Sequence, residues 1–167
     1  MSHPAQIIMG IDPGNAITGY GFIKLTNGRD EPHDFHCGAI SSPSSWNPEN
    51  RLKMIYEKLD TLIKQHRPEE IAVEELFFNK NTKTALSVGE ARGIALLCAA
   101  MNGIPVFSYT PLQVKQAIVG YGRATKDQVL YMVRQILNCR ERISPDDAAD
   151  ALAIAICHSF RKNPYGI

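Results

Sequence analysis

Two apolar runs on either side of a Pro-Gly turn open the sequence and limit what it can fold into. Residues 7–12 and 17–24 are rich in Ile and aromatic residues, and Asp12 ends the first run directly before Pro13-Gly14. Such runs favour strands and Pro-Gly favours a turn, so the pattern predicts a β-hairpin. A lone ionised carboxylate beside a buried strand is costly unless it is paired or binds a metal. Asp12 is therefore the first candidate for a functional residue.

The rest of the chain alternates strand and helix signals. Helical spacing before Pro68, a capping pattern at Thr125–Gln128 and the Ser144-Pro145 start of the last apolar stretch mark three of the helices. The expected elements after the hairpin are a strand at 34–40, a helix at 51–67, a strand at 69–75, a helix at 81–103, a strand at 104–109, and helices at 110–120, 125–138 and 144–160.

This order, β-β-β-α-β-α-β-α-α-α, predicts the fold class. A hairpin meander followed by βα crossovers gives an α/β protein with a mixed five-stranded sheet and helices on both faces. The length of 167 residues and 44% hydrophobic composition suit a single domain, 1–167, with flexible tails at 1–6 and 162–167.

Cysteine usage and hydropathy favour a reducing, cytoplasmic location. The four cysteines form no CxxC pair, so we interpret them as reduced core thiols. No apolar stretch approaches the roughly 20 residues that span a bilayer, and the first residues show no signal-peptide pattern.

Charge is unevenly distributed although the net charge is only +1. Residues 76–134 contain seven Lys or Arg and two acidic residues, whereas the remainder contains 11 and 15. This asymmetry is compatible with a polyanion lying across an acidic site, although ordinary solvated helix faces also collect basic residues.

Four or five acidic residues are candidates for one site. Asp12 and Glu74 each follow an apolar run, and parallel strands joined by a right-handed crossover bring their carboxyl ends to the same edge of the sheet. In the last helix Asp150 shares a face with both Asp147 and Asp146, because residues three and four apart are neighbours. Capping alone accounts for Asp146 and Asp147 but not for Asp150. The alanines around Asp150 would let this helix approach the sheet closely.

A cluster of carboxylates without suitable His or Cys partners is a hard oxygen site. It favours Mg²⁺, with Mn²⁺ as a substitute, over zinc. Two such ions roughly 4 Å apart can activate water and stabilise the leaving oxygen of a phosphodiester. The acids thus point to a metal-dependent nuclease.

At this stage the chain resembles the RuvC-type Holliday-junction resolvases, which have an RNase H-like fold. The resemblance covers nearly the whole chain in order. It is carried by the motifs "GIDPG" at 10–14, "VEELFF" at 73–78, "GEARG" at 89–93, "QVKQAIVGYGRATKDQV" at 113–129 and "DAADALAIA" at the start of the last helix.

The resemblance implies a homodimer that resolves four-way DNA junctions by paired symmetric nicks, in recombination and repair, together with a branch-migration helicase complex of the RuvA and RuvB type. It implies two Mg²⁺ ions per site and selects Asp147 over Asp146. The implied catalytic and metal-binding residues are Asp12, Glu74, Asp147 and Asp150. The implied DNA contacts are Phe77, Lys115 and Lys126, with Lys80, Lys83 and Arg123 as additional phosphate contacts.

Several alternatives stay open at the level of sequence. Phe78 fits a core residue, Glu90 and Arg92 fit either a pair across a dimer or a solvated face, and His158 fits packing or surface. The helix at 82–102 is the expected dimer interface through Leu86, Ala95, Leu96 and Ala99, although a monomer core would bury the same stripe.

A non-catalytic junction-binding scaffold is the alternative function. An ATP-binding kinase of the same superfamily would need a second lobe, for which 167 residues leave little room.

Overall fold

The computed structural model describes residues 5–26, 32–76 and 82–162. Its centre is one five-stranded sheet with the strand order β3-β2-β1-β4-β5. β1 pairs antiparallel with β2, and β2 with β3, whereas the β1–β4 and β4–β5 pairs are parallel. The strands are β1 Gln6–Asp12, β2 Ile17–Leu25, β3 Pro32–Ser41, β4 Glu70–Glu74 and β5 Val106–Tyr109.

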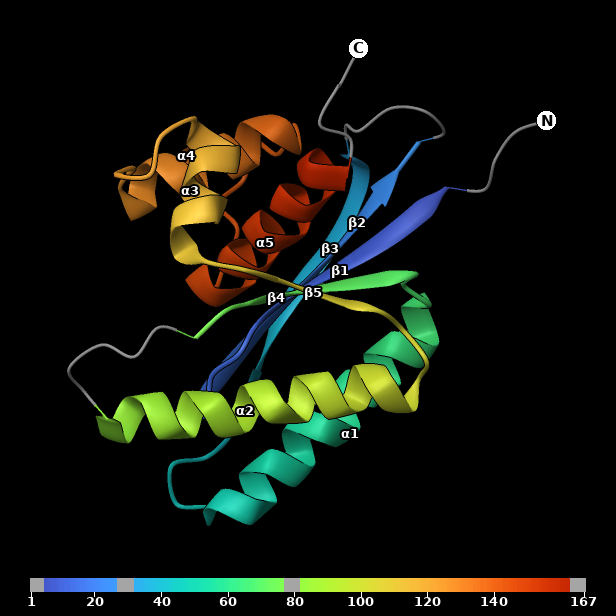
Figure 1. Ribbon diagram of the computed structural model, residues 1–167, viewed down its shortest axis with the longest axis vertical. Coiled ribbons are helices and arrows are strands. Elements are labelled where there is room, and N and C mark those ends of the chain that lie inside the picture. Colours follow the sequence, from blue (N-terminus) through green and yellow to red (C-terminus); the bar gives the residue numbers. More distant parts are fainter. Residues whose placement is uncertain (1–4, 27–31, 77–81, 163–167) are drawn as a thin grey trace.

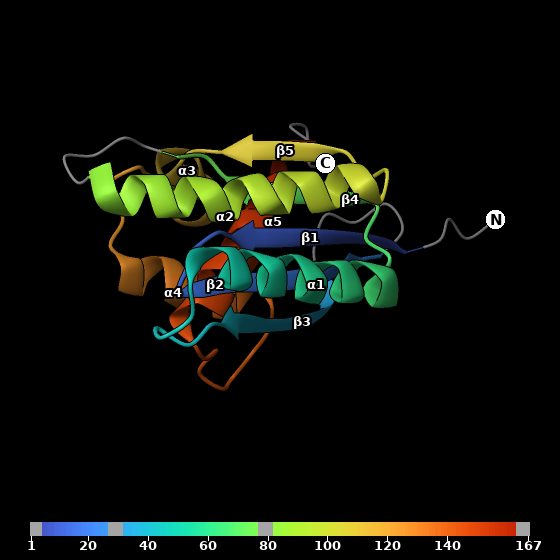
Figure 2. The ribbon, with the colours of Figure 1, turned by 90° about the horizontal axis from the view of Figure 1, so that it is seen from below.

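Helices cover both faces of the sheet, and Figure 1 shows the three layers. The helices are α1 Pro48–His66, α2 Thr82–Met101, α3 Pro111–Val119, α4 Lys126–Ile136 and α5 Asp146–Lys162. α1 and α2 lie side by side on one face (Figure 2), and the other three lie on the opposite face. The predicted α/β class, element order and mixed five-stranded sheet are confirmed. β1 begins at Gln6, within the segment expected to be a tail.

Two hydrophobic cores follow from strand alternation. Ile8 and Ala72 point toward α5, whereas Met9, Ile11 and Val73 point toward α1 and α2. β1 and β4 are therefore buried on both faces, which explains why their sequences read as continuous apolar runs. A polar side chain in the middle of either strand would be buried. Only at the end of the strand can such a side chain reach a less buried environment.

α5 packs directly on the backbone of β1 and β2. A Cβ atom added to Gly10 would lie 1.9 Å from the carbonyl oxygen of Ala151, and one added to Gly19 would lie 2.0 Å from that of Asp147. The sequence predicted this close approach from the alanines of α5. The glycines of the strands supply the other half of the contact.

Two of the helices begin with a complete capping box. The Thr110 hydroxyl accepts from the Gln113 backbone N–H, and the Gln113 side chain accepts from the Thr110 N–H. Thr125 and Gln128 repeat the arrangement at the start of α4. These boxes satisfy N–H groups that a helix start leaves unpaired, as predicted for Thr125.

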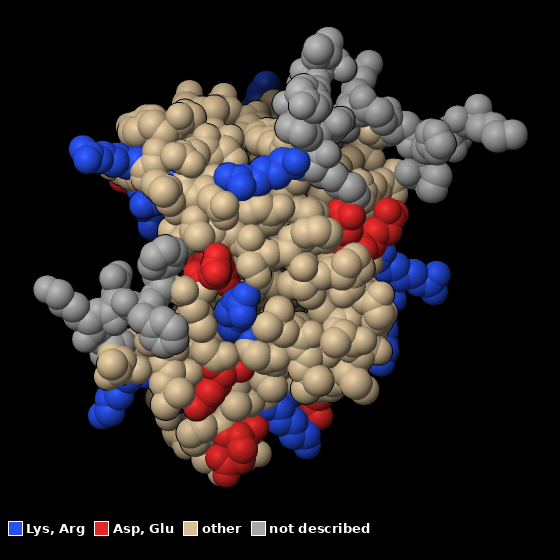
Figure 3. All heavy atoms as spheres, viewed as in Figure 1, with Lys and Arg blue, Asp and Glu red and all other residues tan. Residues whose placement is uncertain are grey.

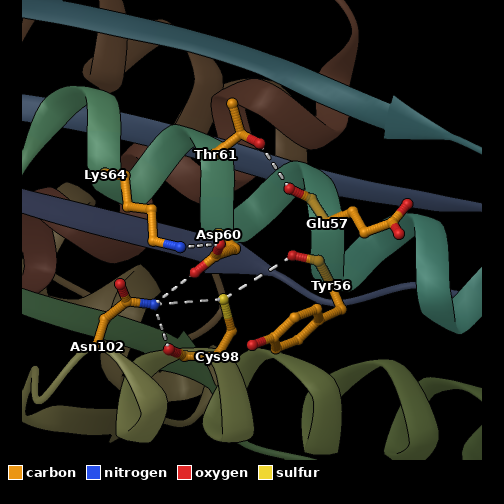
Figure 4. A network of polar contacts seen from close by, with 7 residues as sticks. All are labelled: Tyr56, Glu57, Asp60, Thr61, Lys64, Cys98 and Asn102. Atoms are coloured by element: carbon orange, nitrogen blue, oxygen red, sulfur yellow. Dashed lines mark hydrogen bonds and ion pairs between the residues drawn. The ribbon is translucent and has the colours of Figure 1, made fainter.

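A polar network joins α1 to α2 (Figure 4). The Asn102 amide donates to Asp60 Oδ1 at 2.9 Å and to the carbonyl oxygen of Cys98 at 2.9 Å, and Lys64 Nζ lies 2.5 Å from Asp60 Oδ2. Cys98 itself is buried, and this burial raises the pKa of its thiol to about 11. Of the four cysteines, all of them free, Cys98 and Cys157 are core thiols as expected, whereas Cys37 and Cys139 are only half-buried.

α2 departs from the expectation that no apolar stretch of the chain approaches the length that spans a bilayer. Among the described residues it is the one helix long and apolar enough to cross a membrane by length and composition, a test that the core helix of a soluble protein also passes. Ala95 and Ala99 of the expected interface stripe are buried in the core, whereas Leu86, Leu97 and Met101 are exposed. The apolar stripe is thus divided between the core and an outward face.

Candidate active site

Asp12 and Glu74 meet at the end of two adjacent parallel strands. Ile11 pairs with Val73, so Asp12 and Glu74 are the next residues of β1 and β4. Alternation directs both side chains to the α5 face of the sheet. The two carboxyl groups interact, because each contributes to the shift in the pKa of the other. The predicted meeting of these two acids is present in the structure.

Burial and the neighbouring acids strongly perturb Asp12. Desolvation, followed by the charges of Glu74, Asp150 and Asp147, raises the pKa of Asp12 from 3.8 to about 8. Burial also raises the pKa of Glu74, and the charge of Asp150 acts in the same direction. Four carboxylates from β1, β4 and α5 therefore share one electrostatic environment.

The glycine contact beneath α5 sets the position of Asp147. Gly19 is the β2 partner of Asp12, and a Cβ atom on Gly19 would lie 3.1 Å from the Asp147 Cβ. Asp147 thus lies over the strand pair that holds Asp12. Asp146 instead approaches Arg142 at 3.4 Å and Lys126 at 4.0 Å, and its charge acts on Asp150. Asp147 therefore lies nearer to the strands of Asp12, whereas Asp146 lies on the side of the two cations.

Two lysines border the acids. Lys126 Nζ lies 3.4 Å from Asp150 Oδ2, and the charge of Lys115 lowers the pKa of Glu74. Burial raises the pKa of Asp150, and Lys126 opposes that rise. A cleft of about 270 Å³ lies here, lined by Glu74, Pro111, Val114, Lys115, Lys126, Val129, Asp150, Ala153 and Ile154. Its lining combines apolar side chains with charged side chains of both signs.

The other predicted DNA contacts are less closely tied to the cleft. Lys83 is exposed in the first turn of α2, and Arg123 is exposed between α3 and α4. Phe77, Phe78 and Lys80 lie outside the described residues. The face in Figure 3 shows acidic and basic side chains in small interspersed groups, so the basic middle third of the sequence does not form one continuous patch on this side.

The donor set fits a hard divalent cation. Within the described ranges no three Asp, Glu, His or Cys side chains are already gathered as a ligand set. Burial and the neighbouring acids nevertheless raise the pKa of Asp12 to about 8, and a divalent cation would oppose that rise. Carboxylate oxygens suit Mg²⁺ or Mn²⁺ better than zinc.

Sequence reasoning missed the role of one residue near the site. Arg92 of α2 donates from Nε to the backbone oxygen of Glu74 at 3.2 Å and from Nη2 to Ser108 Oγ at 2.8 Å. The "GEARG" motif was the available signal, but it does not reveal the acceptor. His158, by contrast, is buried as the packing interpretation predicted, with Nδ1 2.6 Å from the Tyr109 hydroxyl and Nε2 2.9 Å from Glu70 Oε2.

A mixed sheet of this order, with acids at the ends of its two central parallel strands and on a helix that crosses one face, defines an α/β protein of the RNase H-like class. The yeast mitochondrial Holliday junction resolvase Ydc2 has this fold, with a TM-score of 0.64 at 16% identity over 99% of this chain and 83% of that one.

Residues 8–158 match the family model described as crossover junction endodeoxyribonuclease RuvC, and the chain belongs to this family. It is 56% identical to the crossover junction endodeoxyribonuclease RuvC of Pelotomaculum thermopropionicum over 154 residues, which cover 92% of this chain and 93% of that protein. The structure of T. thermophilus RuvC in complex with a Holliday junction substrate matches with a TM-score of 0.89 and 36% identity, covering 95% of this chain and 96% of that one.

Proposed function

We propose that this protein is a structure-selective endonuclease that resolves four-way DNA junctions by paired symmetric nicks in recombination and repair. One observation carries the proposal: β1, β4 and α5 bring Asp12, Glu74, Asp147 and Asp150 into one electrostatic cluster beside a cleft that also presents Lys115 and Lys126. Family membership and the match to a junction-bound relative support the same substrate. We place the activity in a single domain in the cytoplasm.

Two Mg²⁺ ions held by the four acids would lower the pKa of the attacking water and neutralise charge at the leaving 3′ oxygen. Asp12 and Glu74 would hold them from the sheet side, and Asp147 and Asp150 from α5. Burial and the neighbouring acids raise the pKa of Asp12 to about 8, and a bound cation would oppose that rise and favour the carboxylate.

The chain's own cations would act on the DNA. Lys126 is poised beside Asp150, and Lys115 beside Glu74, so both ammonium groups lie where a phosphate would approach the acids. They would neutralise backbone charge and stabilise negative charge that develops at the scissile phosphate. Phe77 would stack on a base at the junction centre, and Lys80, Lys83 and Arg123 would contact phosphates farther from the cut.

Assembly follows from the symmetry of the substrate. Two cuts on a four-armed junction require two sites related by a two-fold axis, so a homodimer is the simplest arrangement. We propose the outer face of α2, where Leu86 and Leu97 are exposed, as the dimer contact. A branch-migration helicase complex of the RuvA and RuvB type would deliver the junction.

The decisive experiment compares a synthetic four-way junction with a linear duplex of matched sequence. We expect paired nicks in the junction with Mg²⁺ or Mn²⁺, no nicks with EDTA, and no nicks from Asp12→Asn, which should still bind the junction. Equal cutting of both DNAs would indicate a general nuclease. Binding of the junction by the wild type without cutting would favour a non-catalytic scaffold and overturn the proposal.

A further inference from the structure

The segment that follows β4 lies against one face of α2, on the side of the sheet opposite to the acids. Gly89 and Arg92 are three residues apart and therefore share this face. A Cβ atom on Gly89 would lie 3.4 Å from Leu76 Cδ1, an ordinary van der Waals distance, so Leu76 lies against this turn of α2. Arg92 reaches the backbone oxygen of Glu74 at 3.2 Å. Two contacts of one helical face thus hold residues 74–76.

The same guanidinium also holds the neighbouring strand. Arg92 Nη2 donates to Ser108 Oγ at 2.8 Å, and Ser108 lies on β5, one residue before the partner of Glu74. A planar guanidinium presents its donors in a fixed fork, so one side chain fixes the ends of β4 and β5 relative to α2. The backbone N–H of Glu75 donates to the Tyr109 oxygen at 2.8 Å, which continues the β4–β5 pairing by one residue.

This contact acts on the backbone of Glu74 and not on its charge. The groups that shift the pKa of Glu74 are burial, Asp12, Asp150 and Lys115, and Arg92 is not among them. The Glu74 side chain points toward α5, whereas Arg92 approaches from the α2 side. A residue behind the strand can therefore fix the direction of the carboxylate without contacting it.

We propose that Arg92 is a positioning residue for Glu74, and that the Gly89–Arg92 face of α2 with Ser108 sets where this acid stands relative to Asp12 and Asp150. The inference rests on the proposed nuclease function for its activity readout only. Loss of the Arg92 hydrogen bonds should make the end of β4 more mobile, so that Glu74 contributes less to divalent-cation binding and to cleavage. Affinity for the junction should be preserved.

The test compares Arg92→Ala, Arg92→Lys and Ser108→Ala with the wild type. Two quantities are measured: the single-turnover rate on a bound four-way junction, and the dissociation constant of Mn²⁺ without DNA by calorimetry. Glu74→Gln is the reference variant, because its cleavage rate and Mn²⁺ dissociation constant show the effect of losing the Glu74 carboxylate completely. Glu90→Gln is the matched control, because Glu90 is an exposed neighbour on the same helix.

We expect Arg92→Ala to weaken Mn²⁺ binding and slow cleavage, each by about 10-fold or more, with the junction dissociation constant changed less than about twofold. Ser108→Ala should be intermediate, since the bond to Glu74 remains. Arg92→Lys should show a smaller loss of Mn²⁺ binding and cleavage than Arg92→Ala, but still a loss, because an ammonium group cannot donate to Glu74 and Ser108 in the fixed geometry of a guanidinium. Glu90→Gln should match the wild type.

A lower melting temperature for Arg92→Ala with unchanged Mn²⁺ affinity and rate at 25 °C would show a purely structural role and overturn the inference. So would equal losses in Arg92→Ala and Glu90→Gln. Wild-type protein that binds Mn²⁺ through Glu74 but does not cut junctions would refute the proposed function instead, and the calorimetric comparison would still decide the role of Arg92.

Discussion

At the scale of the residue, Asp12 combines the most unusual sequence context with the most perturbed ionisation. Its pKa rises from 3.8 to about 8 because the fold buries it and surrounds it with other acids. The folded protein thus holds a proton that the unfolded chain releases near pH 4. By linkage, the contribution of Asp12 to stability is complete below that pH and is lost as the pH rises toward 8.

Asp12→Asn removes this cost, because the amide never ionises. Without divalent metal we expect the free energy of unfolding of the variant to exceed that of the wild type by about 5 kcal/mol at pH 8, and by little at pH 4. Urea unfolding in EDTA at several pH values measures the difference. Saturating Mg²⁺ should stabilise the wild type and not the variant. A difference that is constant across this range would contradict the assignment of the raised pKa to Asp12.

At the scale of the element, the sequence indicated most of the site because each acid sits at a marked boundary. The apolar runs of β1 and β4 end in Asp12 and Glu74, and helical spacing places Asp147 and Asp150 on one face. Helical spacing left Asp146 and Asp147 equivalent, because the position of α5 over Gly19, which puts Asp147 nearer to the strands, cannot be read from spacing. The hydrogen bond from Arg92 to Glu74 could not be predicted from the sequence either, because its acceptor is a backbone oxygen.

α2 was the element least predictable from its sequence. It is apolar on most sides, so no single stripe identified the buried face. The structure buries Ala95 and Ala99 and leaves Leu86 exposed, although all three had been assigned to one stripe. Small side chains face the core here because α1 and the sheet lie close.

The close contact between Gly19 of β2 and the backbone of α5 can be tested directly by substitution. Gly19→Ala places a methyl group where the Asp147 carbonyl oxygen lies, so we expect a loss of stability of about 2 kcal/mol or more and strongly reduced cleavage. Gly93→Ala is the control, since nothing lies within 4 Å of its Cβ position, and it should be stabilised by about 0.5 kcal/mol as a helical Gly→Ala change. Thermal unfolding and the junction assay report both effects. Full activity and stability of the Gly19 variant would show that α5 does not need this contact.

At the scale of the whole molecule, the two faces of the sheet have different tasks. The α5 face carries the acids and the cleft, and both faces leave large apolar side chains in solvent. Leu97 is 51% exposed there, and Leu112, on the opposite side of the sheet, is 53% exposed. Equal exposure on opposite faces offers a matched pair for testing where the second copy binds.

We expect Leu97→Glu to weaken self-association by about 10-fold or more, because it places a charge in an apolar contact, with the melting temperature of the dilute protein unchanged. Leu112→Glu should leave association intact. Sedimentation across a range of protein concentrations measures both. If only the Leu112 variant dissociates, the dimer contact lies on the other face.

The glycine seat of α5 also bears on how this protein tolerates sequence drift. Main chain approaches main chain at Gly10 and Gly19, so at these two positions no side chain separates α5 from β1 and β2. A larger residue at either position would push α5, and the acids it carries, away from Asp12. These two positions therefore tolerate glycine alone, and the spacing between the two sets of acids depends on them.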